Sequence, residues 1–85
     1  MPSIRFIGVC RDKYDGFHKI SGNEKPFVNS PEECHEKCKG ESDCVAFRIE
    51  KSLNGCYLYA KGPYTHGEGD SGFTCFVMEG KFYFS

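Results

Sequence analysis

The chain has 85 residues, six of them cysteine, with 39% hydrophobic residues, no tryptophan and a net charge of −1. A chain of this length is expected to form one domain, residues 1–85, whose apolar core is too small for stability without reinforcement. The near-neutral charge argues against a nucleic-acid partner, and no apolar run approaches the length of a membrane span.

The even number of cysteines indicates disulfide bonds, which form and persist in an oxidising compartment. We therefore expect a secreted or extracellular protein. The N-terminal residues lack the charged start and hydrophobic stretch of a signal peptide, so we expect that a signal sequence has been removed.

The N-terminal half of the chain predicts a strand over residues 4–10, a loop over residues 12–26 and a helix over about residues 31–39. The start of the helix is the clearest local signal. Ser30 can cap the first turn, the proline after it suits the first helical position, and Glu33 completes a capping box with Ser30. A glycine after the last lysine is the expected stop.

Beyond the helix, the hydrophobic period changes from about four residues to two, which predicts strands. Val45, Phe47 and Ile49 alternate with small or polar residues, and an Asn-Gly pair at positions 54–55 predicts a hairpin turn. The predicted strands cover residues 45–50, 56–60 and 73–78, with a short final strand at 81–84 and a glycine-rich loop at 61–72.

Two cysteines, Cys34 and Cys38, lie four residues apart and project from one face of the predicted helix. Their side chains run parallel, so we do not expect a bond between them. Cys44 opens the next strand close to Cys38, and Cys56 in the hairpin is within reach of Cys34. Six cysteines permit many pairings, and spacing alone does not choose between them.

The chain resembles the PAN/apple domain family in the run Cys34-x3-Cys38-x5-Cys44-Val45-Ala46-Phe47 and in the Cys56-Tyr57-Leu58 that follows it. The outer cysteines are similar to the bridge that joins the termini in the apple subtype. The resemblance covers about residues 8–78 and leaves an aromatic extension at residues 79–85. It implies an α+β fold, in which an antiparallel β-sheet cradles one α-helix, and the nested disulfides Cys10–Cys75, Cys34–Cys56 and Cys38–Cys44.

Metal binding and catalysis are both disfavoured. Structural zinc sites prefer cysteine pairs separated by two residues, and no such pairs occur, so we predict no metal and expect His35 to face solvent. The segment at residues 69–72, Gly-Asp-Ser-Gly, is similar to the sequence around the nucleophile of chymotrypsin-like proteases, and His66 lies nearby. A chain this short cannot supply the remaining parts of such a site, so we predict no enzyme activity, no catalytic residues and no cofactor.

Binding is the function that remains. Aromatic rings and hydrogen-bonding groups gather in one strand and the loop after it. Tyr57 and Tyr59 share one face of that strand, where we expect them to face outward; the alternative is that they pack against a neighbouring loop or the C-terminal strand. Such a mixture suits sugars, and the resemblance implies either galactose-type sugars or extracellular proteins as ligands. The predicted ligand-binding residues are Tyr57, Tyr59, Lys61, Tyr64, His66, Glu68 and Asp70.

Three kinds of partner follow from this reading. The first is an extracellular glycan or glycoprotein, and the second is an extracellular protein bound in adhesion, matrix or protease contacts. The third is a second copy of the chain, because an exposed strand and the aromatic tail Phe82-Tyr83-Phe84 favour a homodimer.

Overall fold

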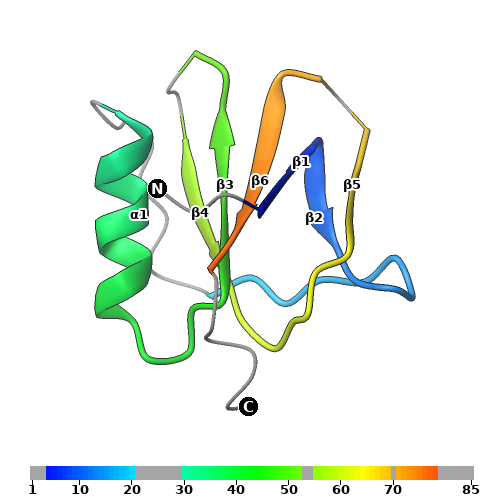
Figure 1. Cartoon of the computed structure of the whole chain (residues 1–85), viewed down its shortest axis with the longest axis horizontal. Helices are drawn as coiled ribbons and strands as arrows, with labels where there is room; N and C mark the ends of the chain where they lie inside the picture. The colour runs from blue at the N-terminus through cyan, green and yellow to red at the C-terminus, as the bar shows by residue number, and fades with distance from the viewer. Residues whose placement is uncertain (1–3, 21–29, 53–54, 70, 79–85) are drawn as a thin grey trace.

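One α-helix and six β-strands make up the part of the chain that the computed structural model describes, which is residues 4–20, 30–52, 55–69 and 71–78. In chain order these elements are β1 (Ile4–Ile7), β2 (Val9–Arg11), α1 (Pro31–Gly40), β3 (Ala46–Glu50), β4 (Cys56–Tyr59), β5 (His66–Glu68) and β6 (Phe73–Val77) (Figure 1). The strand and the aromatic tail predicted at residues 81–84 lie outside the described residues.

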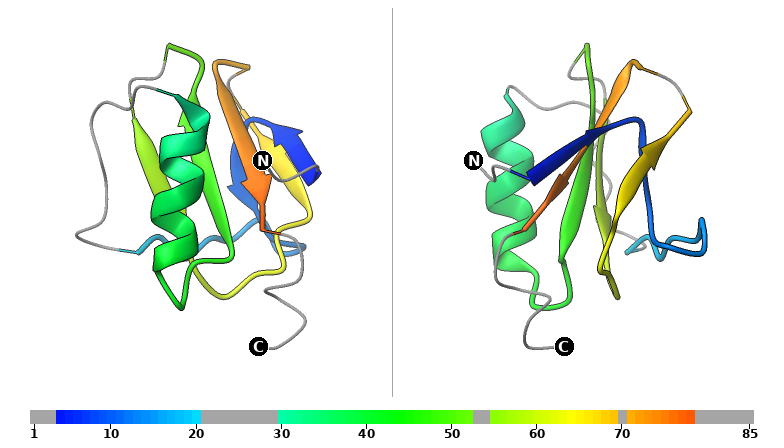
Figure 2. Two further views of the ribbon diagram at one scale, coloured as in Figure 1. Left: turned by 60° about the vertical axis from the view of Figure 1, so that its left-hand side comes forward. Right: turned by 45° about the vertical axis from the view of Figure 1, so that its right-hand side comes forward.

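The strands form two antiparallel sheets. Four of them pair in the order β1-β6-β3-β4, and β2 pairs with β5 in a smaller sheet. The helix packs on β3 and β4 from one side, and the small sheet lies on the other side of the four-stranded sheet (Figure 2). The predicted class, a small disulfide-rich α+β fold with an antiparallel sheet and one helix, is confirmed.

The side chains of β3 explain this layering, because successive side chains along a strand point to opposite faces of the sheet. Phe47 and Ile49 lie in the core beneath the helix, together with Leu58 from β4. Ala46 belongs to a second core on the opposite face, where it packs with Tyr59. Because β3 is covered on both faces, its first two residues, Ala46 and Phe47, are both apolar although they point to opposite faces.

The helix is confirmed over Pro31–Gly40, but the predicted capping box is wrong in its side-chain part. Ser30 is extended, with φ −163°, and its side chain makes no capping hydrogen bond. Its carbonyl oxygen instead accepts a hydrogen bond from the backbone N–H of Glu33 at 3.1 Å. This backbone hydrogen bond helps to close the first turn, where Pro31 already fixes a helical φ.

Two glycines account for the main differences between the predicted and observed strands. The strand predicted over residues 4–10 is divided at Gly8, which has φ +110° and lets the chain leave the large sheet for the small one. The loop predicted over residues 61–72 contains β5, where a Cβ on Gly67 would collide with the carbonyl oxygen of Ile7. Here glycine allows two backbones to approach closely and does not mark a flexible loop.

The disulfides hold these layers together, and the predicted nested pairing is confirmed. All six cysteines are fully buried. The bridge that is outermost in sequence fastens the small sheet to β6. Of the other two, one fastens the first half of α1 to the start of β4, and one fastens the last turn of α1 to the segment that leads into β3. The bonded pairs and their Cα separations are Cys10–Cys75 at 5.1 Å, Cys34–Cys56 at 5.7 Å and Cys38–Cys44 at 5.3 Å.

Candidate functional site

Two of the tyrosines in the predicted site are buried, so the outward orientation expected for Tyr59 is wrong. Tyr59 is 1% exposed and Tyr64 is 4% exposed, and their rings meet edge to face with centroids 5.6 Å apart. The ring of Phe17 also meets that of Tyr59 edge to face, with centroids 6.1 Å apart. The small sheet and the segment at residues 17–20 cover this face, which the alternation of β4 alone did not reveal.

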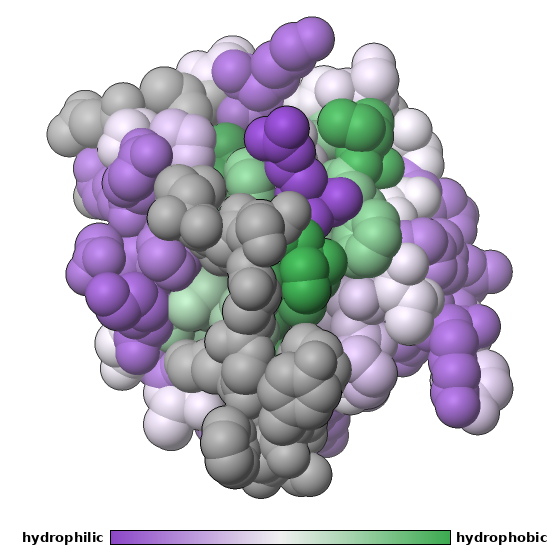
Figure 3. Space-filling view, in the orientation of Figure 1, coloured by the Kyte–Doolittle hydropathy of each residue, from purple (hydrophilic) through white to green (hydrophobic). Residues whose placement is uncertain are grey.

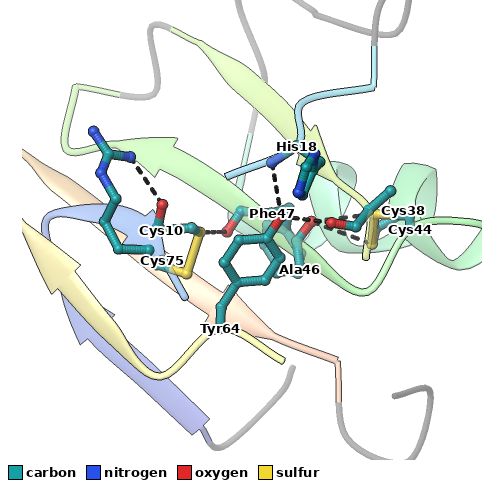
Figure 4. Close-up of a disulfide and its surroundings, with 10 residues drawn as sticks. Cys10, His18, Cys38, Cys44, Ala46, Phe47, Tyr64 and Cys75 are labelled. Atoms are coloured by element: carbon teal, nitrogen blue, oxygen red, sulfur yellow. Dashed lines mark hydrogen bonds between the residues drawn. A yellow bond between two sulfur atoms is a disulfide. The ribbon is translucent and has the colours of Figure 1, made fainter. Parts of the chain in front are cut away.

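Tyr64 has a structural role that its hydrogen bonds define. Its hydroxyl donates to the carbonyl oxygen of Ala60 and accepts from the backbone N–H of His18 at 3.0 Å (Figure 4). Burial raises the pKa of both the Tyr64 and the Tyr59 phenols. The Tyr64 hydroxyl thereby fastens the start of the 60–64 turn to the segment that runs beside β4.

The other predicted site residues that the structure describes lie at the surface in three separate places. Tyr57 is half-buried on β4, Lys61 is exposed just after it, and His66 and Glu68 are on β5. Asp70 lies outside the described residues. The structure therefore does not bring the predicted residues together as one surface.

Lys61 lines a pocket of about 290 Å³ at the edge of the molecule. The loop after β2 supplies one wall and the turn after β4 supplies the other. We call this feature the loop pocket and define it by Asp12, Lys13, Tyr14, Lys61, Gly62 and Pro63. The sequence prediction found only Lys61 among these residues, since the loop at residues 12–16 carries no periodic pattern.

Asp12 organises the first wall of the loop pocket. Its Oδ1 accepts hydrogen bonds from the backbone N–H groups of Tyr14 and Gly16, both at 2.8 Å. These two bonds hold the pKa of the Asp12 carboxyl below its ordinary value, so the group is ionised at neutral pH. Lys13 places its ammonium 5.2 Å from the centroid of the Tyr14 ring, and Tyr14 is 80% exposed.

A second cluster links the same loop to β5. His66 Nε2 lies 2.7 Å from Asp15 Oδ1, and its Nδ1 lies 3.0 Å from the hydroxyl of Thr65. Glu68 is on the same side of β5, and one ligand atom from each of Asp15, His66 and Glu68 lies within 4.8 Å of the others. These three side chains could hold a divalent cation, and the cysteine spacing does not predict such a site.

A third group lies on β3, β4 and the start of β6, and the sequence prediction missed it apart from Tyr57. The guanidinium of Arg48 contacts two rings, with its Cζ 4.1 Å from the centroid of Tyr57 and 4.8 Å from that of Phe73. Lys19 places its Nζ 4.9 Å from the centroid of Tyr57. We call Lys19, Arg48, Tyr57 and Phe73 the cation–aromatic stack.

His35, which we expected to face solvent, is half-buried. Its ring stacks on that of Phe47, with centroids 5.8 Å apart and planes 26° from parallel. Burial lowers the pKa of His35, because the charged imidazolium loses solvation at this position. The side chain therefore belongs to the contact between α1 and β3.

The fold and the surface together define a class of protein, a disulfide-bonded α+β domain with exposed polar and aromatic clusters on a rigid frame. A family model described as the PAN domain matches residues 10–83, and the chain belongs to this family. PAN domains are non-catalytic modules that bind proteins or carbohydrates, and they occur in extracellular proteins. No curated protein and no solved structure shows a match to the chain.

The family and the disulfides both point to an extracellular, oxidising environment for such a domain. Three disulfides fit an oxidising environment. Among the residues that the structure describes, no helix has the length and apolar character needed to cross a membrane.

Proposed function

We propose that this chain is a carbohydrate-binding module of secreted proteins, that it acts without catalysis, and that the loop pocket is its sugar site. The observation that carries the proposal is the pocket itself, about 290 Å³, whose lining residues include one tyrosine, one aspartate and two lysines. Its volume is close to the lower end of the range usual for small-ligand sites, about 300 Å³.

The chemistry of the lining residues supports a sugar ligand. The exposed ring of Tyr14 offers a flat apolar surface to the C–H face of a pyranose, and its hydroxyl remains at the polar tip. The carboxylate of Asp12 accepts hydrogen bonds from sugar hydroxyls, while Lys13 and Lys61 donate them. Galactose-type sugars are the first class to test, since the family resemblance implies them.

The geometry of the pocket also supports a preformed site. The Asp12 loop is closed by two hydrogen bonds to one carboxylate oxygen, and the opposite wall begins at Lys61, which has φ +66°. Tyr64 fastens the base of that wall to His18. A ligand that meets walls already held in place loses less conformational entropy on binding.

A glycan array tests this proposal with the full chain and matched variants. We expect selective binding of galactose-terminated glycans, lost in Tyr14→Ala and weakened at least several-fold in Lys61→Ala. Ile7→Ala, at a position 62% exposed on β1, and Lys51→Ala, beyond β3, are controls that should bind as the parent chain does. Absence of binding to every glycan at high protein concentration would refute the proposal.

A second candidate function, protein binding that includes self-association, is favoured by the edge strand β1. This strand stands at one end of the large sheet and exposes Ile4 at 38% and Ile7 at 62%. Hydrophobic surface is visible over the region of β1 in Figure 3. Light scattering across a concentration series tests self-association: a dimer that Ile7→Lys abolishes would support it, and a monomer at every concentration would exclude it.

A further inference from the structure

We infer that the cation–aromatic stack is a second binding site, which takes the oxyanion of an acidic sugar through the guanidinium of Arg48. The oxyanion is either the carboxylate of a uronic acid or a sulfate ester. The choice of a sugar rests on the proposed function, but the site uses none of the residues of the loop pocket.

The sheet holds Arg48 at a defined place. Arg48 is in the middle of β3, paired with Tyr57 on β4 and with Cys75 on β6, and its side chain lies on the face opposite the helix. The rings of Tyr57 and Phe73 contact its guanidinium at 4.1 and 4.8 Å. Aromatic faces attract a cation and fix the plane of the guanidinium, so its outer edge is oriented before any ligand arrives.

The guanidinium nevertheless carries one N–H, at Nε, that has no acceptor among the described residues. Its Nε is buried and has no hydrogen-bond partner, and none of the described residues forms an ion pair with Arg48. Glu50 is two residues further along the same face of β3, and its carboxylate instead accepts a hydrogen bond from the Ser52 hydroxyl at 3.0 Å. A charged group that the described residues leave without an ion pair favours an acceptor supplied from outside, and such an acceptor would meet the terminal N–H groups, because the Nε itself is closed off from solvent.

Lys19 adds a second positive charge at the same ring. Its ammonium lies 4.9 Å from the centroid of Tyr57, and within the described ranges no carboxylate pairs with it. The segment that carries Lys19 is fixed beside β4, because Ile20 N–H donates to Leu58 and Ala60 N–H donates to His18, both at 2.8 Å. Two cations on one aromatic side chain are thus left without a counterion, although the chain as a whole has a charge of −1.

The residues of the stack select a class of ligand. The planar fork of an arginine matches the oxygens of a carboxylate or a sulfate with two parallel hydrogen bonds. The half-buried rings of Tyr57 and Phe73 lie beside it, and the parts of them that the cations do not cover would meet the carbon skeleton that bears the anion. An acidic sugar uses both features, whereas a small inorganic ion uses only the charge.

NMR of the ¹⁵N-labelled full chain tests the inference through the Nε–Hε resonance of Arg48. We titrate methyl glucuronide, glucose 6-sulfate and, as the neutral control, methyl glucoside. The resonance should move with at least one of the two acidic sugars and stay in place with the neutral sugar. A response to the glucuronide alone assigns carboxylates, a response to the sulfate ester alone assigns sulfated sugars, and either result supports the site.

Variants separate this site from general electrostatics and from the loop pocket. Arg48→Met retains most of the stem beside the two rings and should weaken acidic-sugar binding at least ten-fold, while Arg5→Met, on the exposed strand β1, should leave it unchanged. Tyr14→Ala should leave the Arg48 response intact, so that failure of the loop pocket and failure of the stack give different results. If Arg48→Met does not fold, the inference is tested by the parent chain alone, through the movement of its Arg48 resonance with the acidic sugars and not with methyl glucoside.

Three results would overturn the inference. The first is an equal response to methyl glucoside, and the second is Arg48→Met, folded, binding acidic sugars as tightly as the parent chain. The third is movement of the Arg48 resonance with tetraglutamate but with neither acidic sugar, which would assign the stack to an acidic peptide instead.

Discussion

Asp12 and Gly16 are joined by two hydrogen bonds that run in opposite directions. The backbone N–H of Gly16 donates to Asp12 Oδ1 at 2.8 Å, and the backbone N–H of Asp12 donates to the carbonyl oxygen of Gly16 at 2.9 Å. The chain between them forms a closed loop that carries Lys13 and Tyr14 into the wall of the loop pocket. The conformation of this wall of the proposed sugar site therefore depends on the ionised carboxylate of Asp12.

The first prediction concerns the pH dependence of that loop. Hydrogen bonds from Gly16 and Tyr14 lower the pKa of Asp12 in the folded protein, so its contribution to stability is present above the pKa of the unfolded chain. This contribution is lost as the pH falls through the folded pKa. Thermal unfolding between pH 7 and pH 2 should show a smaller loss of stability on acidification in Asp12→Asn than in the parent chain.

The exposed Asp43, in the turn after the helix, provides the control for this measurement. Asp43→Asn should follow the parent chain across the pH series. If Asp12→Asn and Asp43→Asn have the same profile, the hydrogen bonds to Asp12 do not order the loop.

The second prediction concerns His35, which stacks on Phe47. Burial lowers its pKa in the folded state, so near pH 6 the unfolded chain binds more protons than the folded one. The free energy of unfolding should therefore rise with pH from about 5 to 7.5, around the ordinary histidine pKa of about 6.5. His35→Leu should remove this part of the pH dependence, whereas His18→Leu, at an exposed position, should retain it. A rise of the same size in His35→Leu contradicts the stacked, half-buried position.

The third prediction ranks the disulfides by the chain segments they close. The sequence separations of 65 and 6 residues correspond to about 4 kcal/mol for Cys10–Cys75 and about 2 kcal/mol for Cys38–Cys44 in the chain-entropy model. Urea unfolding of the two double alanine variants should show the larger loss for the Cys10–Cys75 pair. The reverse order would mean that packing around the helix end, and not chain entropy, dominates.

The fourth prediction tests the close approach between β5 and the turn from β1 to β2. A Cβ on Gly67 would overlap the backbone of Ile7, so Gly67→Ala must move the small sheet and should lower the unfolding temperature by several degrees. Gly40→Ala is the matched control, because nothing lies within 4 Å of the new methyl group at the end of α1. We expect that control to be neutral or slightly stabilising, since alanine favours helix over glycine by up to about 1 kcal/mol. Equal stability of the two variants contradicts the close approach.

The sequence predicts the parts of this fold that local signals specify. Pro31 and the polar residues around it mark the helix, and the alternation around Phe47 marks β3, because capping and periodicity act within a few residues. The alternation also places Tyr57 and Tyr59 on one face of β4. It does not say what covers that face, and the small sheet buries Tyr59 while leaving Tyr57 half-exposed.

The sites depend on contacts between distant segments and were largely beyond prediction for that reason. Arg48 meets Phe73 through the pairing of β3 with β6, a register that no short stretch of sequence contains. The loop pocket brings Tyr14 and Lys61 together across the chain, and only Lys61 belonged to the predicted set. The family match covers residues 10–83 and agrees with the observed disulfide frame.

The most direct test of the account is an NMR titration of the ¹⁵N-labelled chain with methyl β-galactoside. Amide resonances of Tyr14, Gly16 and Gly62 should shift together with one dissociation constant, because these backbone groups belong to the two walls of the loop pocket or are hydrogen-bonded to them. Resonances of α1 should remain in place. No shift at saturating sugar concentrations, or shifts confined to β1 or α1, would contradict a sugar site between the two loops.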